Sequence, residues 1–266
     1  YLSCGFGIVV INTEKKEVKD TWYIAEGGAH LTIYDMASDG TYLYAATAEG
    51  IYRALAGEPN LQDYSNWQRF SNLHPNGRFT QIENLNGKII ACYSPASGND
   101  ELYMLDNGNW TRVFTEISKV YDMTVAFNDR IIISNNGDVY IFAENGTIIE
   151  KIYMYVFADL QIKGIDPRCT LLNSDGTYWI ADNLYGLVRK KGEVSEQVSP
   201  GGPVDNSSFS LSISEGNLWI ASGGRDAAWG NLWNQARFQK YSAGTWSVFD
   251  YSKYSIMSGF HDVVCI

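Results

Sequence analysis

The sequence has few of the residues that build reactive or metal-binding sites. It contains four cysteines and three histidines among 266 residues. The cysteines are far apart and form no Cys-x-x-Cys pair, so no zinc cluster is expected, and we expect each to be a small buried apolar residue. No HExxH, phosphate-loop, nucleophile-elbow or dinucleotide-binding motif occurs. We therefore expect no catalytic site, no metal and no cofactor.

Long apolar runs and excess basic charge are also missing, and prolines are few. No apolar run approaches the length of a membrane-spanning helix. The net charge of −10 argues against nucleic acid or an anionic membrane as the main partner. Six prolines and no Pro/Ser-rich run give no linker, so we expect one domain over residues 1–266. The chain begins within a predicted strand, and we expect it to be a fragment of a larger multi-domain protein.

The sequence does have a recurring pair of strands joined by tight turns. In the clearest copy, Asp39–Arg53, an Asp-Gly turn precedes an alternating strand, and a Glu-Gly turn leads into a second strand. Such dipeptides between alternating apolar runs are strong hairpin signals, because both turn positions tolerate positive φ. Later copies recur at intervals of 40 to 47 residues, with first turns at Gly40, Gly87, Asp129, Gly176 and Gly216.

This period, with four strands in each unit, predicts an all-β fold, a β-propeller of six to seven four-stranded blades. Residues 1–24 contain three predicted strands and lack the inner strand, which is the first of the four in a blade. The last six residues, HDVVCI, resemble a lone inner strand. We expect both chain ends to complete one blade, which would place Cys4 and Cys265 on adjacent strands, free or bonded. The expected strand groups are 1–24, 31–72, 79–116, 120–153, 169–198 and 208–249, with a long connection at 154–168.

One hairpin carries an insertion that its turn does not need. The segment 223–238, GGRDAAWGNLWNQARF, separates two predicted strands and holds two tryptophans and two arginines. Long loops in compact repeats are often functional, tryptophan faces stack on sugars or anchor proteins, and arginines clamp phosphate or carboxylate. The alternative is a loop folded over its own blade, with both tryptophans buried there. The predicted ligand-binding or partner-binding residues are Arg225, Trp229, Trp233 and Arg237.

Scattered carboxylates give a second, enzymatic hypothesis. Asp35, Asp122, Asp159 and Asp182 could gather around the channel if neighbouring blades align them. Two carboxylates suffice for glycoside hydrolysis. They are also ordinary polar residues of blade surfaces, and no calcium-loop pattern accompanies them. The pair His261-Asp262 could similarly be an acid/base or metal pair, but a polar strand start is the simpler interpretation.

The N-terminal stretch is more specific than a generic repeat. It resembles the PorZ family of surface proteins of the Bacteroidetes type IX secretion system, through Phe6–Asn12, Glu17–Thr21, Asn60-Leu61, Asp63 and Trp67. The likeness covers about the first 70 residues. Downstream, the likeness is mainly in the recurring pair of strands, which is similar to the propeller repeats of two-component regulators.

The resemblance implies a larger protein with two propellers and a C-terminal β-sandwich. It implies a place at the cell surface, in a complex that attaches secreted cargo to lipopolysaccharide, beside a sortase-like protease and without catalysis of its own. We therefore expect a non-catalytic scaffold that binds partner proteins or lipopolysaccharide and does not insert into a membrane. The alternatives are a sensor ectodomain that recognises an oligosaccharide and a carbohydrate-active enzyme. The family offers no catalytic motif to carry over.

Overall fold

The computed structural model describes residues 1–127, 129–157, 162–198 and 201–266. The chain divides into two compact units, residues 1–198 and residues 199–266. A single domain over residues 1–266, closed by both chain ends, stays a prediction because it involves both units. No described helix is long and apolar enough to cross a membrane.

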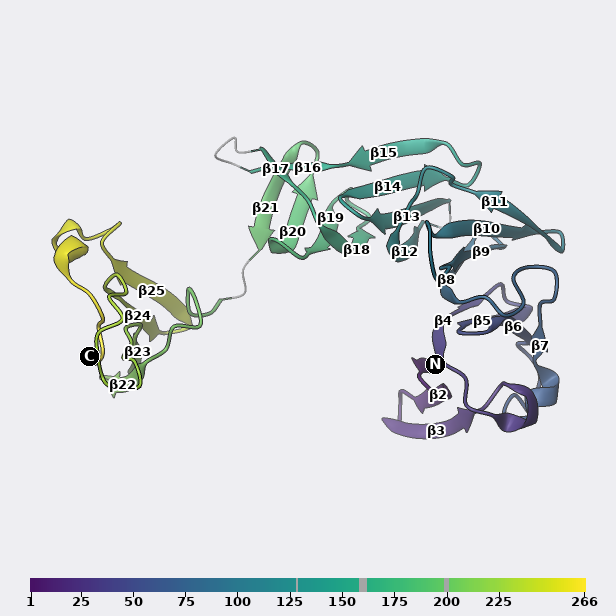
Figure 1. The fold of residues 1–266 in the computed structure, drawn as a ribbon, viewed down its shortest axis with the longest axis horizontal. Helices are drawn as coiled ribbons and strands as arrows, with labels where there is room; N and C mark the ends of the chain where they lie inside the picture. Colours follow the sequence, from purple (N-terminus) through teal and green to yellow (C-terminus); the bar gives the residue numbers. More distant parts are fainter. Residues whose placement is uncertain (128, 158–161, 199–200) are drawn as a thin grey trace. The chain divides into compact units, whose positions relative to one another are not determined.

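The first unit is built from antiparallel meanders, in which each strand pairs with the next one along the chain (Figure 1). A three-stranded sheet comes first, and three sheets of four strands and a two-stranded ribbon follow before the last four-stranded sheet. The strands are β1 (Leu2–Cys4), β2 (Gly7–Asn12), β3 (Glu17–Trp22); β4 (Ile33–Ser38), β5 (Tyr42–Thr47), β6 (Gly50–Leu55), β7 (Gln68–Arg69); β8 (Phe79–Leu85), β9 (Lys88–Tyr93), β10 (Glu101–Asp106), β11 (Asn109–Val113); β12 (Val120–Ala126), β13 (Arg130–Asn135), β14 (Asp138–Ala143), β15 (Ile148–Ile152); β16 (Met154–Val156), β17 (Ile162–Gly164); β18 (Pro167–Leu172), β19 (Tyr178–Asp182), β20 (Gly186–Lys191), β21 (Val194–Val198).

Two short 3-10 helices lie in the connections around the second sheet, and the second unit has one more. These are η1 (Glu26–Gly28), η2 (Tyr64–Asn66) and η3 (Ser255–Gly259). The second unit holds one four-stranded meander, with β22 (Ser210–Ser214), β23 (Asn217–Ala221), β24 (Arg237–Ser242) and β25 (Thr245–Asp250). The predicted all-β propeller fold is thus confirmed at the level of its repeating sheets. The predicted irregular connection at 154–168 contains the β16–β17 ribbon instead.

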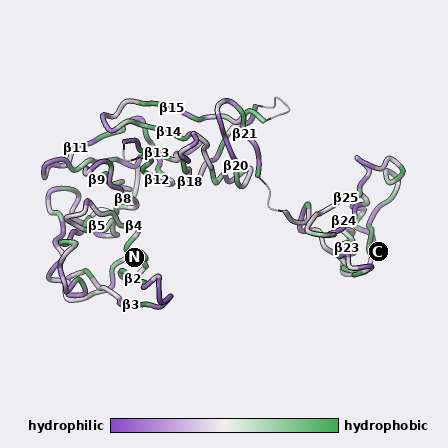
Figure 2. The backbone as a smooth tube through the Cα atoms, turned by 180° about the vertical axis from the view of Figure 1, so that it is seen from behind, coloured by the Kyte–Doolittle hydropathy of each residue, from purple (hydrophilic) through white to green (hydrophobic). Residues whose placement is uncertain are grey.

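Hydrophobic and hydrophilic residues separate along the strands as the alternation predicts. Figure 2 shows hydrophobic segments within the strands and hydrophilic residues at the tips of the β2–β3 and β10–β11 hairpins. The first strands of successive sheets pack on one another, β4 on β8, β8 on β12 and β12 on β18. This contact between inner strands is the arrangement expected for neighbouring propeller blades.

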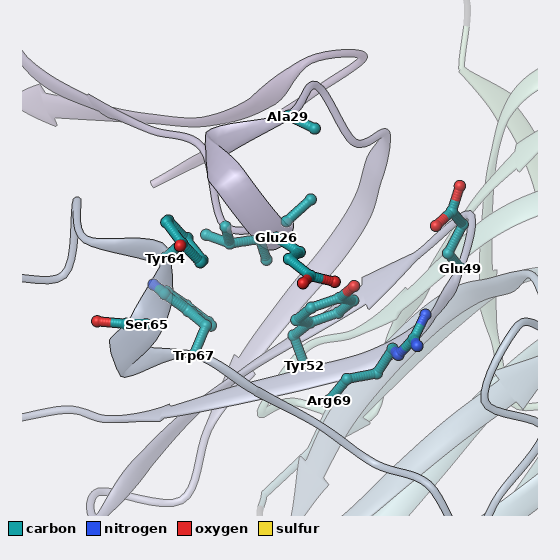
Figure 3. A pocket seen from close by; sticks show the side chains of 10 residues that line it. Glu26, Ala29, Glu49, Tyr52, Tyr64, Ser65, Trp67 and Arg69 are labelled. Carbon is teal, nitrogen blue, oxygen red and sulfur yellow. The ribbon is translucent and has the colours of Figure 1, made fainter.

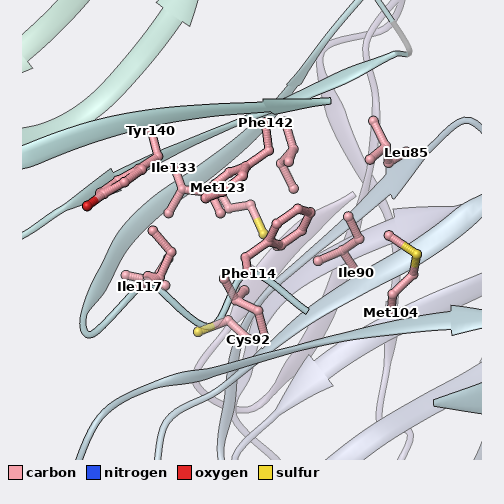
Figure 4. Close-up of a cluster of buried hydrophobic side chains, with 13 residues drawn as sticks. Leu85, Ile90, Cys92, Met104, Phe114, Ile117, Met123, Ile133, Tyr140 and Phe142 are labelled. Carbon is pink, nitrogen blue, oxygen red and sulfur yellow. The ribbon is translucent and has the colours of Figure 1, made fainter. Parts of the chain in front are cut away.

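The core lies between adjacent sheets. In one cluster, side chains of β8–β10 interlock with those of β12–β14, including Met123, Ile133 and Phe142 (Figure 4). Cys92 belongs to this cluster and is fully buried, as expected of an apolar cysteine. That expectation is wrong for Cys265, which is exposed; both it and Cys4, which is half-buried, are free thiols.

The C-terminal residues do not form the lone strand that their sequence suggests. Instead, they lie against the second unit's own loop and sheet. The backbone N–H of Gly223 donates to Val263 at 2.8 Å, and the hydroxyl of Ser210 donates to the carbonyl of Val264 at 2.9 Å. The contact with Gly223 is so close that a Cβ there would lie 2.3 Å from the Val263 oxygen. A glycine is therefore required at this position.

Candidate functional site

The inner strands of the first unit share a bulge, and at this position one of the predicted channel carboxylates, Asp35, has a structural role. In each of β4, β8, β12 and β18 the register shifts near the start of the strand. A bulge leaves a backbone N–H without a ladder partner. The carboxylate of Asp35 accepts the N–H of Ile82 in the next inner strand at 2.9 Å. Gln81 makes the same kind of contact one sheet later, where its side-chain oxygen accepts the backbone N–H of Met123 at 3.1 Å.

Asp35 and Asp122 do approach each other, with a third carboxyl group that the sequence did not single out. Burial, and then the charges of Asp35 and Asp122, raise the pKa of Glu83 to about 7. Burial also raises the pKa of Asp35, against the hydrogen bonds that it accepts from the backbone. Glu83 lies two residues after Gln81 on β8, so both side chains point to the same face of the strand. This spacing is the sequence pattern that could have indicated Glu83.

The other predicted carboxylates do not belong to this group. Asp182 is buried at the end of β19, where it accepts hydrogen bonds from the Tyr155 hydroxyl and from the backbone of Asp166 and Leu184. It therefore holds a turn together. Asp159 lies outside the described residues. Within the described ranges, no group of three or more His, Cys, Asp or Glu side chains could hold a metal ion.

The insertion of the second unit is a loop held in shape by two aspartates. The side chain of Asp226 accepts the N–H groups of Ala228 and Gly230, at 2.8 and 2.7 Å. The side chain of Asp262 accepts those of Trp233 and Asn234, at 2.8 and 3.0 Å. Charge-assisted bonds of this kind are roughly twice as strong as neutral ones. The His261-Asp262 pair thus contains a buried loop anchor.

The two tryptophans of this loop project into solvent. Trp229 is 76 % exposed and Trp233 is 69 % exposed, and both have positive φ angles, 63° and 60°. The ring of Trp233 meets the ring of His261 edge-on, with centroids 5.8 Å apart. The alternative in which both rings cover their own sheet is therefore not what the structure shows.

The two arginines of the predicted set differ from each other. Arg225 is half-buried and closes the turn by a bridge to Asn231. Arg237, at the start of β24, forms ion pairs with Asp205 and Asp250. Its guanidinium is already matched by two carboxylates, so it is less available to a ligand than the tryptophans are. The structure thus joins Trp229, Trp233 and Arg225 in one loop and ties Arg237 to the sheet.

A second candidate site is a pocket of about 430 Å³ in the first unit (Figure 3). It lies between η1, the turn that joins β5 to β6, and η2, and its lining combines aromatic rings with Glu26, Glu49 and Arg69. The lining comes from three segments that are separated in the sequence. Sequence reasoning missed it because no short motif connects these segments.

Comparison with known proteins places the likeness in the N-terminal part. Residues 1–68 match the family model of the N-terminal β-propeller domain of PorZ from the type IX secretion system. The resemblance predicted from the sequence is therefore confirmed over this stretch, which is about a quarter of the chain. No curated protein matches the sequence significantly.

Solved structures extend the likeness in fold. PorZ of Porphyromonas gingivalis, described as an essential bacterial surface component of the type IX secretion system, matches with a TM-score of 0.61 at 20% identity, over 95% of this chain and 32% of its own. A Bacteroides caccae protein of unknown function matches at 0.46 and 12%, over 96% and 94% of the two chains. The extracellular domain of a candidate one-component system from B. thetaiotaomicron matches at 0.46 and 14%, over 90% and 35%.

The likeness to the PorZ structure, with a TM-score of 0.61, supports a common fold. The chain spans about a third of the length of the PorZ structure. We conclude that this chain is a β-propeller whose first 68 residues are similar to the N-terminal propeller domain of PorZ.

Proposed function

We propose that this chain is a non-catalytic binding propeller of a PorZ-like component of a type IX secretion system at the cell surface. It binds lipopolysaccharide or a partner protein of the surface complex through the insertion loop of its second unit. The observation that carries the proposal is the pair of tryptophans, exposed by 76 % and 69 %, on a loop that two aspartates hold in shape.

Exposed tryptophans on a fixed loop are suited to binding. Tryptophan is enriched among the residues that dominate binding energies, because its large ring combines an apolar face with a polar N–H. Because Asp226 and Asp262 hold the loop through backbone hydrogen bonds, less conformational freedom is lost when a partner covers the rings. The same rings stack on sugars or pack against a protein.

The role of Asp35 supports a non-catalytic function. Asp35 accepts two backbone N–H groups, from Met36 and from Ile82. A carboxylate so engaged has less capacity left for proton transfer to a substrate. The match of residues 1–68 to PorZ supports the assignment to a surface secretion component.

The test measures binding of the full chain to lipopolysaccharide vesicles, to the same vesicles without lipopolysaccharide, and to the purified sortase-like protease of the complex. Trp229→Ala and Trp233→Ala are each expected to weaken the relevant binding about tenfold or more, which corresponds to ~1.4 kcal/mol. Because both side chains are exposed, the variants should keep the wild-type melting temperature.

Tyr153→Ala is the matched control, since it removes an exposed aromatic ring from the first unit. It should leave affinity unchanged. If the chain binds neither probe, or if both tryptophan variants bind as tightly as the wild type, the proposed role of the loop is wrong.

A further inference from the structure

The pocket of the first unit has a charged part and an apolar part. Its charged part contains the carboxyl groups of Glu26 and Glu49, the guanidinium of Arg69 and the hydroxyl of Tyr52 (Figure 3). Ile24, Ala25, Tyr64 and Trp67 form most of the apolar part. With about 430 Å³ the pocket falls in the size range of small-molecule sites, roughly 300–1,000 Å³.

The charged groups of the pocket are not matched with one another. Across residues 1–127, 129–157, 162–198 and 201–266, neither glutamate and no atom of Arg69 takes part in an ion pair within 4.0 Å. The guanidinium of Arg69 donates to the amide oxygen of Asn76 at 3.2 Å, which is a neutral partner. Opposite charges thus line one hollow while neither is neutralised by the other.

The apolar part is held in place by local structure. The indole N–H of Trp67 donates to the carbonyl of Leu61 at 2.8 Å, and the ring is buried. Asp63 caps η2 by accepting the N–H of Ser65, which positions Tyr64 at the pocket. The helix η1 packs against η2, and the side chain of Glu26 lies beside Tyr52, between the rings of Tyr64 and Trp67 and the side chain of Arg69 (Figure 3). The aromatic side of the pocket is therefore fixed, whereas Glu26, Glu49 and Arg69 are exposed side chains at its charged side.

The register of the sheet explains why Arg69 lies in this pocket. Arg69 on β7 pairs with Tyr52 on β6, and paired residues point to the same face of a sheet. Their neighbours Arg53 and Gln68 pair with each other on the opposite face, where Arg53 donates to the amide oxygen of Gln68. Only one guanidinium thus joins the two carboxylates.

From this arrangement we propose that the pocket binds a free α-amino acid with an apolar side chain. Its ammonium group lies between Glu26 and Glu49, its carboxylate receives a two-pronged contact from Arg69, and its side chain lies on Tyr64 and Trp67. A simple anion would meet two carboxylates, and a simple cation would meet Arg69. A ligand that carries both charges can pair with the two carboxylates and with Arg69 at the same time.

The experiment is titration calorimetry of the full chain at neutral pH with three probes. These are L-leucine, L-leucinamide, which lacks the carboxylate, and N-acetyl-L-leucine, which lacks the ammonium group. Leucine is expected to bind, and each analogue at least tenfold more weakly. Glu26→Gln and Arg69→Gln should each weaken leucine binding about tenfold, a typical loss for a charged contact.

Glu14→Gln is the control, because it removes an exposed glutamate far from the pocket lining and should not change binding. Circular dichroism melting checks that each variant is folded. The proposal is overturned if a folded wild-type chain does not bind leucine at millimolar concentration. It is equally overturned if leucinamide or N-acetyl-leucine binds as well as leucine does, since the site would then recognise a single charge.

Discussion

At the bulge of each of two inner strands, a single side chain forms a hydrogen bond to the backbone of the next sheet. Asp35 and Gln81 occupy the same place in successive strands and make the same hydrogen bond to the following strand. Each satisfies a backbone N–H that would otherwise be buried without a partner, which costs about 1–3 kcal/mol. Either an amide or a carboxylate can do this, because only an acceptor oxygen is needed.

Glu83, which lies near Asp35, makes the free energy of unfolding depend on pH. Its pKa is raised from 4.5 to about 7, so the folded state binds the proton more tightly than the unfolded state does. The contribution of Glu83 to stability is therefore fullest below pH 4.5 and is lost as pH rises through about 7. After allowance for its partial exposure, we expect Glu83→Gln to stabilise the protein by roughly 1–2 kcal/mol above pH 7.

Melting temperatures of wild type and Glu83→Gln between mildly acidic and mildly alkaline pH measure this effect. The two curves should converge at acidic pH, where wild-type Glu83 is protonated. Glu116→Gln, which changes an exposed glutamate, should follow the wild type throughout. A constant difference between Glu83→Gln and wild type at every pH would show that packing, and not ionisation, causes it.

At the scale of elements, the β5–β6 turn is fixed by a contact with the connection that follows the same sheet. The N–H of Gly50 donates to the carbonyl of Gly77 at 2.7 Å. Gly50 has a φ of 99°, and a Cβ at this position would lie 2.7 Å from the carbonyl oxygen of Pro75. Only glycine both adopts this angle without strain and leaves room for the neighbouring backbone.

We predict that Gly50→Ala destabilises the chain by about 2–4 kcal/mol, because backbone strain and a backbone clash add. Gly40→Ala is the comparison, since its φ is 89° but nothing lies within 4 Å of the added Cβ. It should cost only the strain, about 1–2 kcal/mol. Urea unfolding measures both, and equal losses would exclude the clash at Gly50.

At the scale of the whole molecule, buried apolar residues are concentrated in the first unit. All four hydrophobic clusters lie within residues 1–198. In the described part of the second unit, the buried apolar residues are Ile220, Ala221 and Ala236. Buried apolar area is the main source of stability, so the two units should differ in how well they fold alone.

We expect a fragment of residues 1–198 to fold with a cooperative thermal transition and a β-type circular dichroism spectrum. A fragment of residues 199–266 should unfold without a sharp transition, since it lacks a core of comparable size. A cooperative second fragment, or a molten first one, would show that stability is not distributed as the clusters suggest.

The sheets were predictable because their signals are local. Alternation between apolar and polar residues, with turns at Gly40, Gly87 and Gly176, specifies hairpins within a few residues of chain. The prediction of an irregular connection at 154–168 was wrong in part. Three-residue strands such as Met154–Val156 have too short a pattern to be recognised from the sequence. The insertion was visible as excess length, and its tryptophans as residues with no place in the repeat.

The sequence alone determined the all-β repeat, the N-terminal likeness to PorZ and the insertion with Trp229 and Trp233, because each depends on residues close together in the chain. Only the tertiary structure decided that Arg237 is matched by Asp205 and that Glu26 and Arg69 line one pocket. These groups are tens of residues apart, and their pairing depends on strand register and on how connections fold across a sheet. Spacing along the chain does not encode that.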